Sequence, residues 1–408
     1  MEFCTLEEEE FIKFSETSDE KTFMQTKETA EVREKNGWKK HYVGVKENSK
    51  IIAGAMLVSK KTYFGKTKFY SPRGFLLDYH NEELFSYFTE EIKKYVKKYN
   101  GYEIKIDPYV VNVERDSSGQ IVEGGIDNRS LQDTFKKLGY IRSKKENMEQ
   151  VNWMYCLDIE GKTEEEILKG MKANTRNIIR KNEKNEIEII ELEKNELKDF
   201  YKIMEETGKR KNFAIRSLKH YEDMYDAFKE KNEIKYIITK LNLKNYIKKL
   251  EQEKEDIEIS KNKLSDAKAN DGKRKSMNET IKGIDKKIKI AKEERNENGD
   301  IITLSGSMFI LTKPEIVYLS SGNYEEYLQY NSQYLIQWEM IKYAIKNGYK
   351  RYNFYGITGN FDKNDKDYGI YKFKTGFGGY TEELIGEYTL PTSFFYYIIK
   401  FLKKLKVK

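Results

Sequence analysis

The sequence is poor in the residues that build disulfide frameworks and metal sites. Its two cysteines and three histidines show no ligand spacing, so neither a disulfide network nor a zinc site is supported. We therefore expect a reducing compartment and no resident metal. These residues are Cys4, Cys156, His41, His80 and His220.

Long apolar stretches are missing as well. No run of about 18 apolar residues occurs, which predicts that the chain does not cross a membrane. The N-terminal segment contains the acidic run Glu7 to Glu10 and has no apolar core of a signal peptide. A cytoplasmic protein is expected.

Charge of both signs is abundant. Lysine and arginine number 75 and aspartate and glutamate 68, so the net charge is only +7 although 35% of the residues are charged. Such mixing indicates a charged surface with locally basic sites rather than a polycation. A hydrophobic share of 38% over 408 residues suffices for two ordinary cores, and the length favours two or three domains.

Strands and helices alternate along the first part of the chain. The Glu47-Asn-Ser turn joins two strand patterns, and Asn81 is placed to cap a helix that ends before Asn100-Gly101. This order predicts an open mixed sheet. The expected strands are 41–45, 51–59, 68–74, 102–106 and 152–157, and a second helix is expected at 128–138.

A similar order returns after Thr163. Thr163-Glu-Glu-Glu166 is a capping box that opens a helix expected to run to about Lys181. Because the two parts share their order, we interpret them as a duplicated α/β domain. The further elements are strands 186–191, 233–241, 301–312, 315–320 and 351–355, and helices 195–207, 218–228 and 332–347.

The pattern between residues 241 and 301 is a heptad. Leucine and isoleucine recur every seven residues through 243–264, and a second apolar series through 277–291 steps by four and three. These series predict two helices of an antiparallel coiled coil with Asn270-Asp-Gly272 at its tip. Since both flanks are strand-like, the arm is expected to replace the turn of a β-hairpin. A solvated charged spacer is the alternative.

The stretch Tyr352 to Gly379 is rich in glycine and aromatics. Gly356 and Gly359 are expected to allow a tight turn with positive φ after a strand, and a short helix is expected over 369–377. A lysine on such a helix, beside a glycine-lined strand end, can place a cation next to a developing oxyanion. An exposed lysine without function is the alternative.

The tail 393–408 runs from aromatic residues into lysines. This order suits the interface of an anionic membrane, and a terminal helix docked on the protein's own core is the alternative. The lysines that end the tail are Lys403, Lys404, Lys406 and Lys408.

Three segments together carry a family resemblance. They are Leu335-Ile-Gln-Trp-Glu-Met-Ile-Lys-Tyr-Ala344, Tyr352-Asn-Phe-Tyr-Gly-Ile357 and Gly369-Ile-Tyr-Lys-Phe-Lys-Thr-Gly-Phe-Gly378. They resemble the Fem (FemABX) family of aminoacyl-tRNA-dependent transferases, which build the interpeptide bridge of peptidoglycan. The resemblance implies that the two α/β parts are acetyltransferase-like (GNAT-like) domains, 1–160 and 161–241 with 301–392. The heptads place an inserted coiled-coil arm at 242–300, and the composition of the tail places an amphipathic basic helix at 393–408.

The implied reaction is aminolysis of an ester. The side-chain amine of the third stem-peptide residue attacks the carbonyl of aminoacyl-tRNA and passes through a tetrahedral oxyanion. Because the ester is already activated, the protein supplies positioning, a base and oxyanion donors, without a covalent nucleophile or a cofactor. The amino acid is glycine, alanine or serine, which the sequence does not distinguish, and neither does it tell whether the acceptor amine belongs to lysine or diaminopimelate.

The resemblance also implies partners and a location. Aminoacyl-tRNA is the donor, and the acceptor is the lipid-linked peptidoglycan precursor, which the arm and the tail favour, or its soluble UDP-linked form. The implied place is the cytoplasm, peripherally on the inner face of the bacterial cell membrane. A monomer and a homodimer both fit.

Site residues follow from the resemblance position by position. The essential lysine of the FKxGF segment falls on Lys374, and the carboxylate of a strand-Asp-Pro motif falls on Asp107, for which a strand terminator is the alternative. Independently of the resemblance, the concentrated positive charge of the arm tip predicts tRNA binding through Lys273, Arg274 and Lys275. The precursor would meet Arg33, where lysine is usual, Arg216, His220 at a tyrosine position, the following Tyr221, and Tyr318, for which a sheet aromatic is the alternative.

Two other classes of protein remain as alternatives. An acyl-CoA N-acetyltransferase would share the half-domain fold, but the sequence has no glycine-rich pyrophosphate loop leading into a helix. A non-catalytic tRNA-binding coiled-coil protein would explain the arm but not the glycine frame around Lys374.

Overall fold

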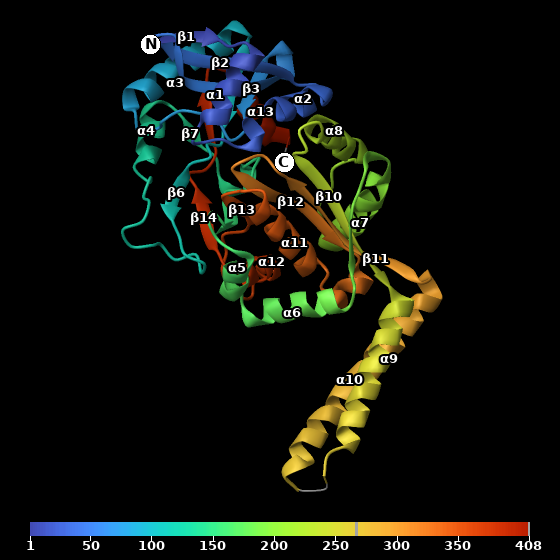
Figure 1. Cartoon of the computed structure of the whole chain (residues 1–408). Coiled ribbons are helices and arrows are strands. Elements are labelled where there is room, and N and C mark those ends of the chain that lie inside the picture. The colour runs from blue at the N-terminus through green and yellow to red at the C-terminus, as the bar shows by residue number, and fades with distance from the viewer. Residues whose placement is uncertain (266–267, 407–408) are drawn as a thin grey trace.

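The computed structural model describes residues 1–265 and 268–406, without the side chains of three tail lysines (Figure 1). Lys403, Lys404, Lys406 and Lys408, which the tail hypothesis invokes, therefore lie outside the described side chains. Within the described ranges, no helix combines the length and the hydropathy that a membrane span requires.

Two mixed β-sheets form the body, which confirms the predicted α/β class. The first sheet has the order β1 (Glu2–Thr5), β2 (Lys39–Glu47), β3 (Lys50–Lys61), β4 (Thr67–Ser71), β5 (Gly101–Ile106), β15 (Tyr388–Pro391) and β7 (Ile141–Arg142). The second has the order β6 (Val111–Glu114), β14 (Tyr380–Leu384), β8 (Trp153–Asp158), β13 (Arg351–Ile357), β12 (Glu315–Asn323), β11 (Ile301–Ile310), β10 (Ile234–Asn242) and β9 (Glu188–Glu191).

The topology of the two sheets repeats. In each sheet, three antiparallel strands are followed by a helix and then by a strand that lies parallel to the third, which requires a crossover connection. The crossover helices are α3 (Glu82–Lys98) and α11 (Gln333–Lys346). The Asn81 side chain accepts from the N–H of Leu84 at 3.0 Å, which confirms the predicted cap of α3.

The sheets do not divide the chain at the predicted boundary of residue 160. Strands β6 and β8 belong to the second sheet although they precede that boundary, and β15 returns from the C-terminal part into the first sheet. The local alternation of apolar and polar residues predicts that a segment is a strand, but it does not predict which strands pair with it. The exchange pairs strand edges that each half alone would leave open, and it ties the two halves together.

One predicted helix is two helices in the structure. The capping box at Thr163 is present, but α5 (Glu164–Gly170) ends early and α6 (Ala173–Lys184) follows it. Met171 and Lys172 are extended between them, and the backbone N–H of Lys172 donates to the carbonyl of Gly376 at 2.9 Å. A tertiary hydrogen bond thus favours the break over the continuous helix that the spacing predicts.

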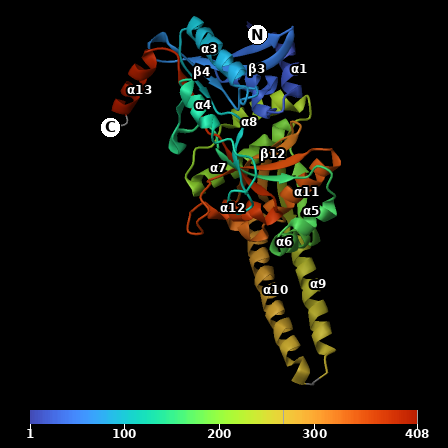
Figure 2. The ribbon, with the colours of Figure 1, turned by 90° about the vertical axis from the view of Figure 1, so that its left-hand side faces the viewer.

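The arm projects from the second sheet as an antiparallel helix pair, as predicted (Figures 1 and 2). Helices α9 (Leu243–Asn262) and α10 (Asp271–Asn298) replace the turn between β10 and β11. The predicted tip is wrong in detail, because Asp271 and Gly272 already belong to α10. Asn270 and Arg274 donate to the carbonyl of Ser265, which precedes the predicted tip in the chain.

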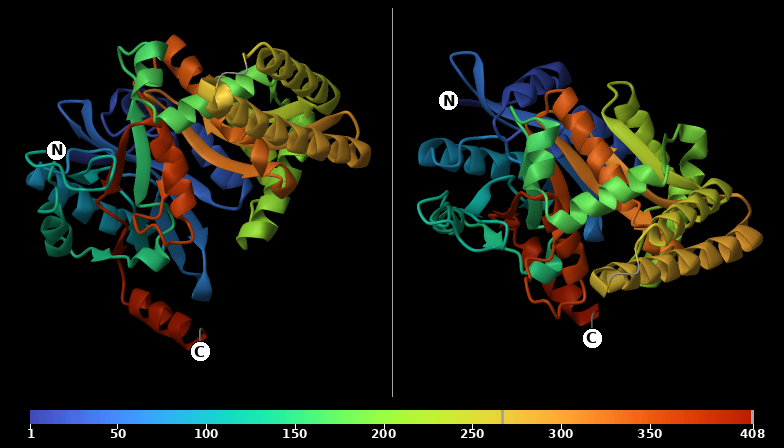
Figure 3. Two further views of the ribbon diagram at one scale, coloured as in Figure 1. Left: turned by 90° about the horizontal axis from the view of Figure 1, so that it is seen from below. Right: turned by 60° about the horizontal axis from the view of Figure 1, so that its bottom comes forward.

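The tail forms α13 (Phe395–Lys406), which stands at the side of the body away from the arm (Figure 2 and the left view of Figure 3). Tyr396 and Ile399 pack against Tyr102 of β5. One face of the helix is therefore docked on the protein's own core, as one of the two interpretations of the tail expects.

Candidate active site

Lys374 is the last residue of α12 (Tyr368–Lys374), and its amine contacts the end of strand β13. The side chain is 5% exposed, and Nζ donates to the carbonyls of Gly356 at 2.6 Å and Tyr355 at 3.2 Å. Burial lowers the pKa of this amine to about 7, because desolvation disfavours the charged form. Lys374 is thus a buried lysine whose amine is hydrogen-bonded to two carbonyls and titrates near neutral pH, and it is not an exposed lysine.

The backbone of Tyr355 presents these carbonyls. Its φ is +61°, a left-handed conformation that is uncommon for a tyrosine, and the Oδ1 of Asn353 accepts its N–H at 2.7 Å. The predicted positive φ at Gly356 is therefore wrong, although that at Gly359 is right. Gly356 is needed for another reason, since a Cβ there would lie 2.7 Å from Val151.

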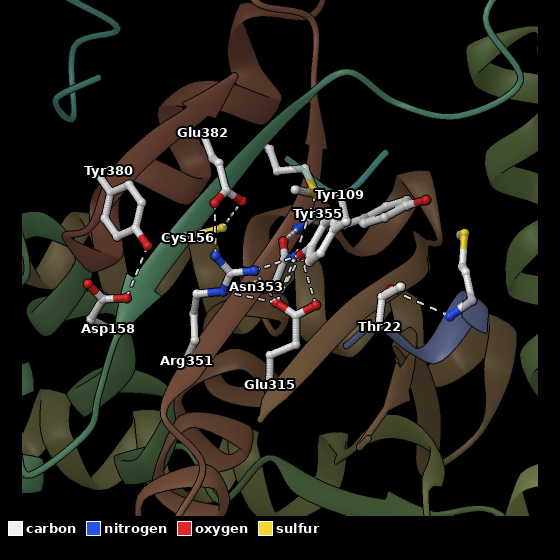
Figure 4. Close-up of polar contacts among 12 residues, drawn as sticks. Thr22, Tyr109, Cys156, Asp158, Glu315, Arg351, Asn353, Tyr355, Tyr380 and Glu382 are labelled. Carbon is white, nitrogen blue, oxygen red and sulfur yellow. Dashed lines mark hydrogen bonds and ion pairs between the residues drawn. The ribbon is translucent and has the colours of Figure 1, made fainter. Parts of the chain in front are cut away.

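A buried charged network orients Asn353 (Figure 4). The guanidinium of Arg351 bonds Glu315 at 2.8 Å and Glu382 at 2.9 Å. The Nδ2 of Asn353 donates to Glu315 at 3.2 Å and to the hydroxyl of Tyr109 at 3.1 Å, which turns Oδ1 toward Tyr355. Through Asn353, the network therefore stabilises the left-handed conformation of Tyr355 at the end of β13.

A cavity of about 500 Å³ opens beside Lys374. Tyr318 lines this cavity and also stacks on Phe309, with the ring centroids 5.5 Å apart. It is therefore both a cavity residue and an aromatic residue packed in the sheet. Burial raises the pKa of Tyr318 to about 12, which keeps its hydroxyl neutral. The other polar and apolar lining includes Lys211, Ser320, Gln333, Tyr334, Tyr355, Gly356, Lys366, Ile370 and Phe373.

Asp107 is buried at the end of β5. It accepts from the backbone N–H of Arg73 at 2.7 Å and from the hydroxyl of Tyr70 at 3.0 Å, and a guanidinium nitrogen of Arg73 lies 3.9 Å away. Burial raises the pKa of Asp107 to about 6, opposed by Arg73. A residue that only ended a strand would need none of these donors.

Arg73 is a site residue that the sequence did not reveal. It is buried with φ +54°, it donates to the carbonyl of Val151 at 2.7 Å, and its guanidinium lies 5.7 Å from the ring centre of Tyr109. The strand expected over 68–74 covered Arg73, but β4 ends at Ser71 and Arg73 lies in the turn that follows. The signal in the sequence was Pro72-Arg-Gly74, which is typical of a turn. Arg73 connects Asp107 to the network around Arg351.

Tyr355 joins the two candidate catalytic groups. Its carbonyl accepts from Lys374, its hydroxyl donates to Gln150 at 3.1 Å, and the nearby Arg73 opposes the rise in pKa that burial causes in this phenol. Lys374 and the Arg73–Asp107 pair therefore meet at one residue.

The predicted precursor residues form a second group. Helix α2 (Lys27–Lys35) packs on α8 (Leu218–Lys229), and burial together with Arg216 and Arg33 lowers the pKa of His220 to about 4, so His220 is neutral at pH 7. The Arg33 guanidinium lies 5.7 Å from the ring centre of Tyr70, the donor to Asp107.

Tyr221 links this group to the cavity. Burial raises its pKa, and Ser320, a cavity residue, and Arg216 oppose that rise. The structure thus brings together every predicted residue except those of the arm. Lys273, Arg274 and Lys275 lie at the far end of α10 (Figure 1). Among the described residues, no group of three or more histidine, cysteine or acidic side chains is arranged to hold a metal.

Comparisons with known proteins cover nearly the whole chain. A family model described as the FemAB family matches residues 6–404. The aminoacyltransferase FemA of Staphylococcus epidermidis is 31% identical over 420 residues, covering 100% of both chains. FemA of Staphylococcus aureus (strain MRSA252) is 30% identical over 403 residues, covering 96% of this chain and 95% of the relative. The crystal structure of FemX superposes with a TM-score of 0.73 and 25% identity, covering 96% of this chain and 97% of FemX.

Proposed function

Because the chain belongs to the FemAB family and is an aminoacyltransferase, we propose that it moves glycine, alanine or serine from aminoacyl-tRNA to the stem peptide of lipid-linked peptidoglycan precursor. The acceptor is the side-chain amine of the third peptide residue. The observation that carries the proposal is Lys374, a buried amine held by two carbonyls in the wall of a cavity of about 500 Å³.

Lys374 is proposed to stabilise the tetrahedral oxyanion. A lysine ammonium has three N–H donors, and the described structure uses two of them on Tyr355 and Gly356, so the third is left for a ligand. A cation in a site with little water stabilises developing negative charge more strongly than one in bulk solvent. Its pKa of about 7 means that a substantial fraction is protonated at neutral pH.

Asp107 is proposed to take the proton that the attacking amine releases as the amide bond forms. The ester bond to tRNA then breaks, and the ribose oxygen leaves as a hydroxyl that carries this proton. A carboxylate with a pKa of about 6 is ionised at neutral pH and is a stronger base than an ordinary aspartate. Tyr70 and the N–H of Arg73 hold it in one orientation. No cofactor is needed, since the ester itself is the activated group.

The precursor is proposed to lie along the second group of residues. Arg33 and Arg216 can pair with a diphosphate, which the lipid-linked and the UDP-linked precursors share. The neutral His220 would supply a hydrogen bond where the family has tyrosine, and Tyr221 and Tyr318 continue the path toward the cavity.

The donor tRNA is proposed to contact the arm tip. Arg274 bonds the carbonyls of Leu264 and Ser265, so Lys273 and Lys275 are the better candidates for phosphate contacts. The enzyme would act in the cytoplasm, peripherally on the inner face of the bacterial cell membrane, as a monomer or a homodimer.

The test is a transfer assay with purified protein, tRNA charged with each of the three amino acids, and either lipid-linked or UDP-linked precursor. Mass spectrometry of the product identifies the amino acid and the acceptor. We expect faster transfer to the lipid-linked form. Transfer from acetyl-CoA but not from charged tRNA would overturn the proposal, and so would efficient turnover of the UDP-linked form alone.

A further inference from the structure

Three segments that are far apart in the sequence meet beside the first sheet. They are the β3–β4 loop, the C-terminal end of α3 and the tail helix α13 (Figure 2). Asn100 after α3 donates to the carbonyl of Gly65 at 3.1 Å and accepts from Lys66 at 2.7 Å. The same Lys66 amine lies 4.1 Å from the ring centre of Phe395 in α13. We name the joint surface of these three segments the tail patch.

The tail patch exposes large apolar side chains. On α13, Tyr397, Phe401 and Leu405 are spaced by four and lie on the face that does not dock on Tyr102. At the tip of the loop, Phe64 has a positive φ of 56°, and its ring is two-thirds in solvent. The exposed fractions are 48% for Tyr63, 68% for Phe64, 74% for Phe394, 54% for Tyr397, 62% for Phe401 and 55% for Leu405.

The three segments of the tail patch carry charge of a single sign, and the neighbouring acid is the half-buried Glu103 of β5, which pairs with Lys68 in the sheet. Residues 60–70, 97–102 and 392–408 contain no aspartate or glutamate, in a chain where these two types number 68 of 408. Each segment contributes lysine, and the tertiary fold gathers the three beside one another. In these segments the lysines with described side chains are Lys66, Lys97, Lys98 and Lys400. Lys61 ends β3 beside the loop, whereas the amines of Lys60 and Lys68 on the adjoining strands lie over the ring of Trp38.

We infer that the tail patch is a docking surface for an anionic lipid bilayer, with Phe64 at the loop tip as a second anchor beside the tail helix. An amphipathic helix with an aromatic face and flanking lysines lies in the plane of a membrane interface, and anionic headgroups attract the lysines. RNA phosphates would satisfy the lysines but would leave the row from Tyr397 to Leu405 in water.

The inference deepens the proposed function, since a lipid-linked precursor lies in such a surface. Docking itself rests only on the patch. The two can therefore be separated experimentally, because vesicles without any precursor measure docking alone.

The experiment is flotation of the full chain with mixed phosphatidylglycerol–phosphatidylcholine vesicles. We expect wild type to bind these vesicles and not vesicles of phosphatidylcholine alone. Phe64→Ser should lower the partition coefficient about tenfold, the scale of burying one aromatic side chain. Lys97→Gln with Lys98→Gln should lower it by a similar factor, through lost attraction to anionic headgroups. The matched control is Ile121→Ser, a 50% exposed apolar residue away from the patch, and it should bind as wild type does.

Activity then distinguishes docking from catalysis. Phe64→Ser should transfer normally to a water-soluble, short-chain analogue of the precursor and several-fold more slowly to precursor embedded in vesicles. If wild type floats with vesicles but transfers to neither substrate, the proposed function fails while the docking surface stands.

Three results would overturn the docking inference. The first is wild-type protein that does not float with anionic vesicles, and the second is a Phe64→Ser variant that floats as well as wild type. The third is a change by Phe64→Ser in tRNA affinity or in the oligomeric state seen by ultracentrifugation without a change in flotation, which would assign the patch to RNA or to a second copy of the chain.

Discussion

The cavity wall and the arm tip both owe their proposed roles to lysines, but the two regions use that charge differently. Lys374 is buried, two carbonyls hold it, and its pKa is about 7. Lys273 and Lys275 lie on an exposed helix end in solvent. A buried cation interacts strongly with a nearby negative charge, such as the developing oxyanion, because little water screens it. Cations in solvent each contribute a small, salt-screened attraction to the phosphates of tRNA. Variants in the two regions should therefore differ in size, in salt dependence and in pH dependence.

The largest effect is expected at Lys374. Lys374→Ala should lower kcat by about 100-fold or more, the scale of losing one oxyanion donor, while the fold is retained. Single-turnover transfer from charged tRNA measures this. Lys372→Ala is the matched control, because Lys372 lies on the same helix but is exposed, and it should stay within about twofold of wild type. Comparable kcat values for Lys374→Ala and wild type would remove the assignment.

A second large effect is expected at Asn353, which holds the backbone of Tyr355, an acceptor of Lys374. Asn353→Leu removes the acceptor that holds the N–H of Tyr355, so kcat should fall roughly tenfold to 100-fold while KM for the precursor changes little, since a misplaced group costs about that much. Thr381→Val is the control, because its buried hydroxyl has no hydrogen-bond partner in the described structure. The prediction is wrong if Asn353→Leu stays folded by thermal melting and keeps its kcat.

The pH dependence of kcat should show both titrating groups. Activity should rise as Asp107 ionises with a pKa of about 6 and fall as Lys374 loses its proton with a pKa of about 7, which gives a narrow maximum between these values. Lys374→Arg keeps the charge at all these pH values, so its residual activity should have no alkaline limb. An alkaline limb that persists in Lys374→Arg would assign that limb to another group.

The stability of the fold should also report the burial of Lys374. Its pKa is lower in the folded chain than in the unfolded chain, so the unfolded state binds more protons above pH 7, and the free energy of unfolding should rise as the pH increases from about 7 toward 10. Lys374→Met should flatten this slope when unfolding by urea is measured at several pH values. An equal slope in both proteins would show that Lys374 keeps an ordinary pKa.

The smallest effect is expected at the arm. Lys273→Ala with Lys275→Ala should weaken tRNA binding only a few-fold at physiological salt and should lower the slope of log Kd against log salt by roughly two. Lys286→Ala with Lys289→Ala, two exposed lysines farther along the same helix, is the control. If removal of residues 245–297 leaves both the affinity and the slope unchanged, the arm does not bind tRNA.

Much of the secondary structure was predictable because it is local. The cap at Asn81, the capping box at Thr163 and the heptads of the arm each depend on residues within a few positions of one another. The same local reasoning misplaced the positive φ near Gly356, because the side chain of Asn353 moves it to Tyr355. It also missed the break at Lys172, which a distant carbonyl stabilises.

The sequence by itself determined the two-part α/β plan, the inserted arm and the positions of Lys374, Asp107 and Tyr318, because residue type, spacing and family motifs are all written along the chain. The tertiary structure alone decided which strands cross between the sheets and which polar groups lose their water. Burial is a property of what surrounds a residue in space, so the pKa of Lys374 and the Arg73–Asp107 pair had no local signal. The tail patch arises in the same way, since three lysine-bearing segments become one surface only when the chain folds.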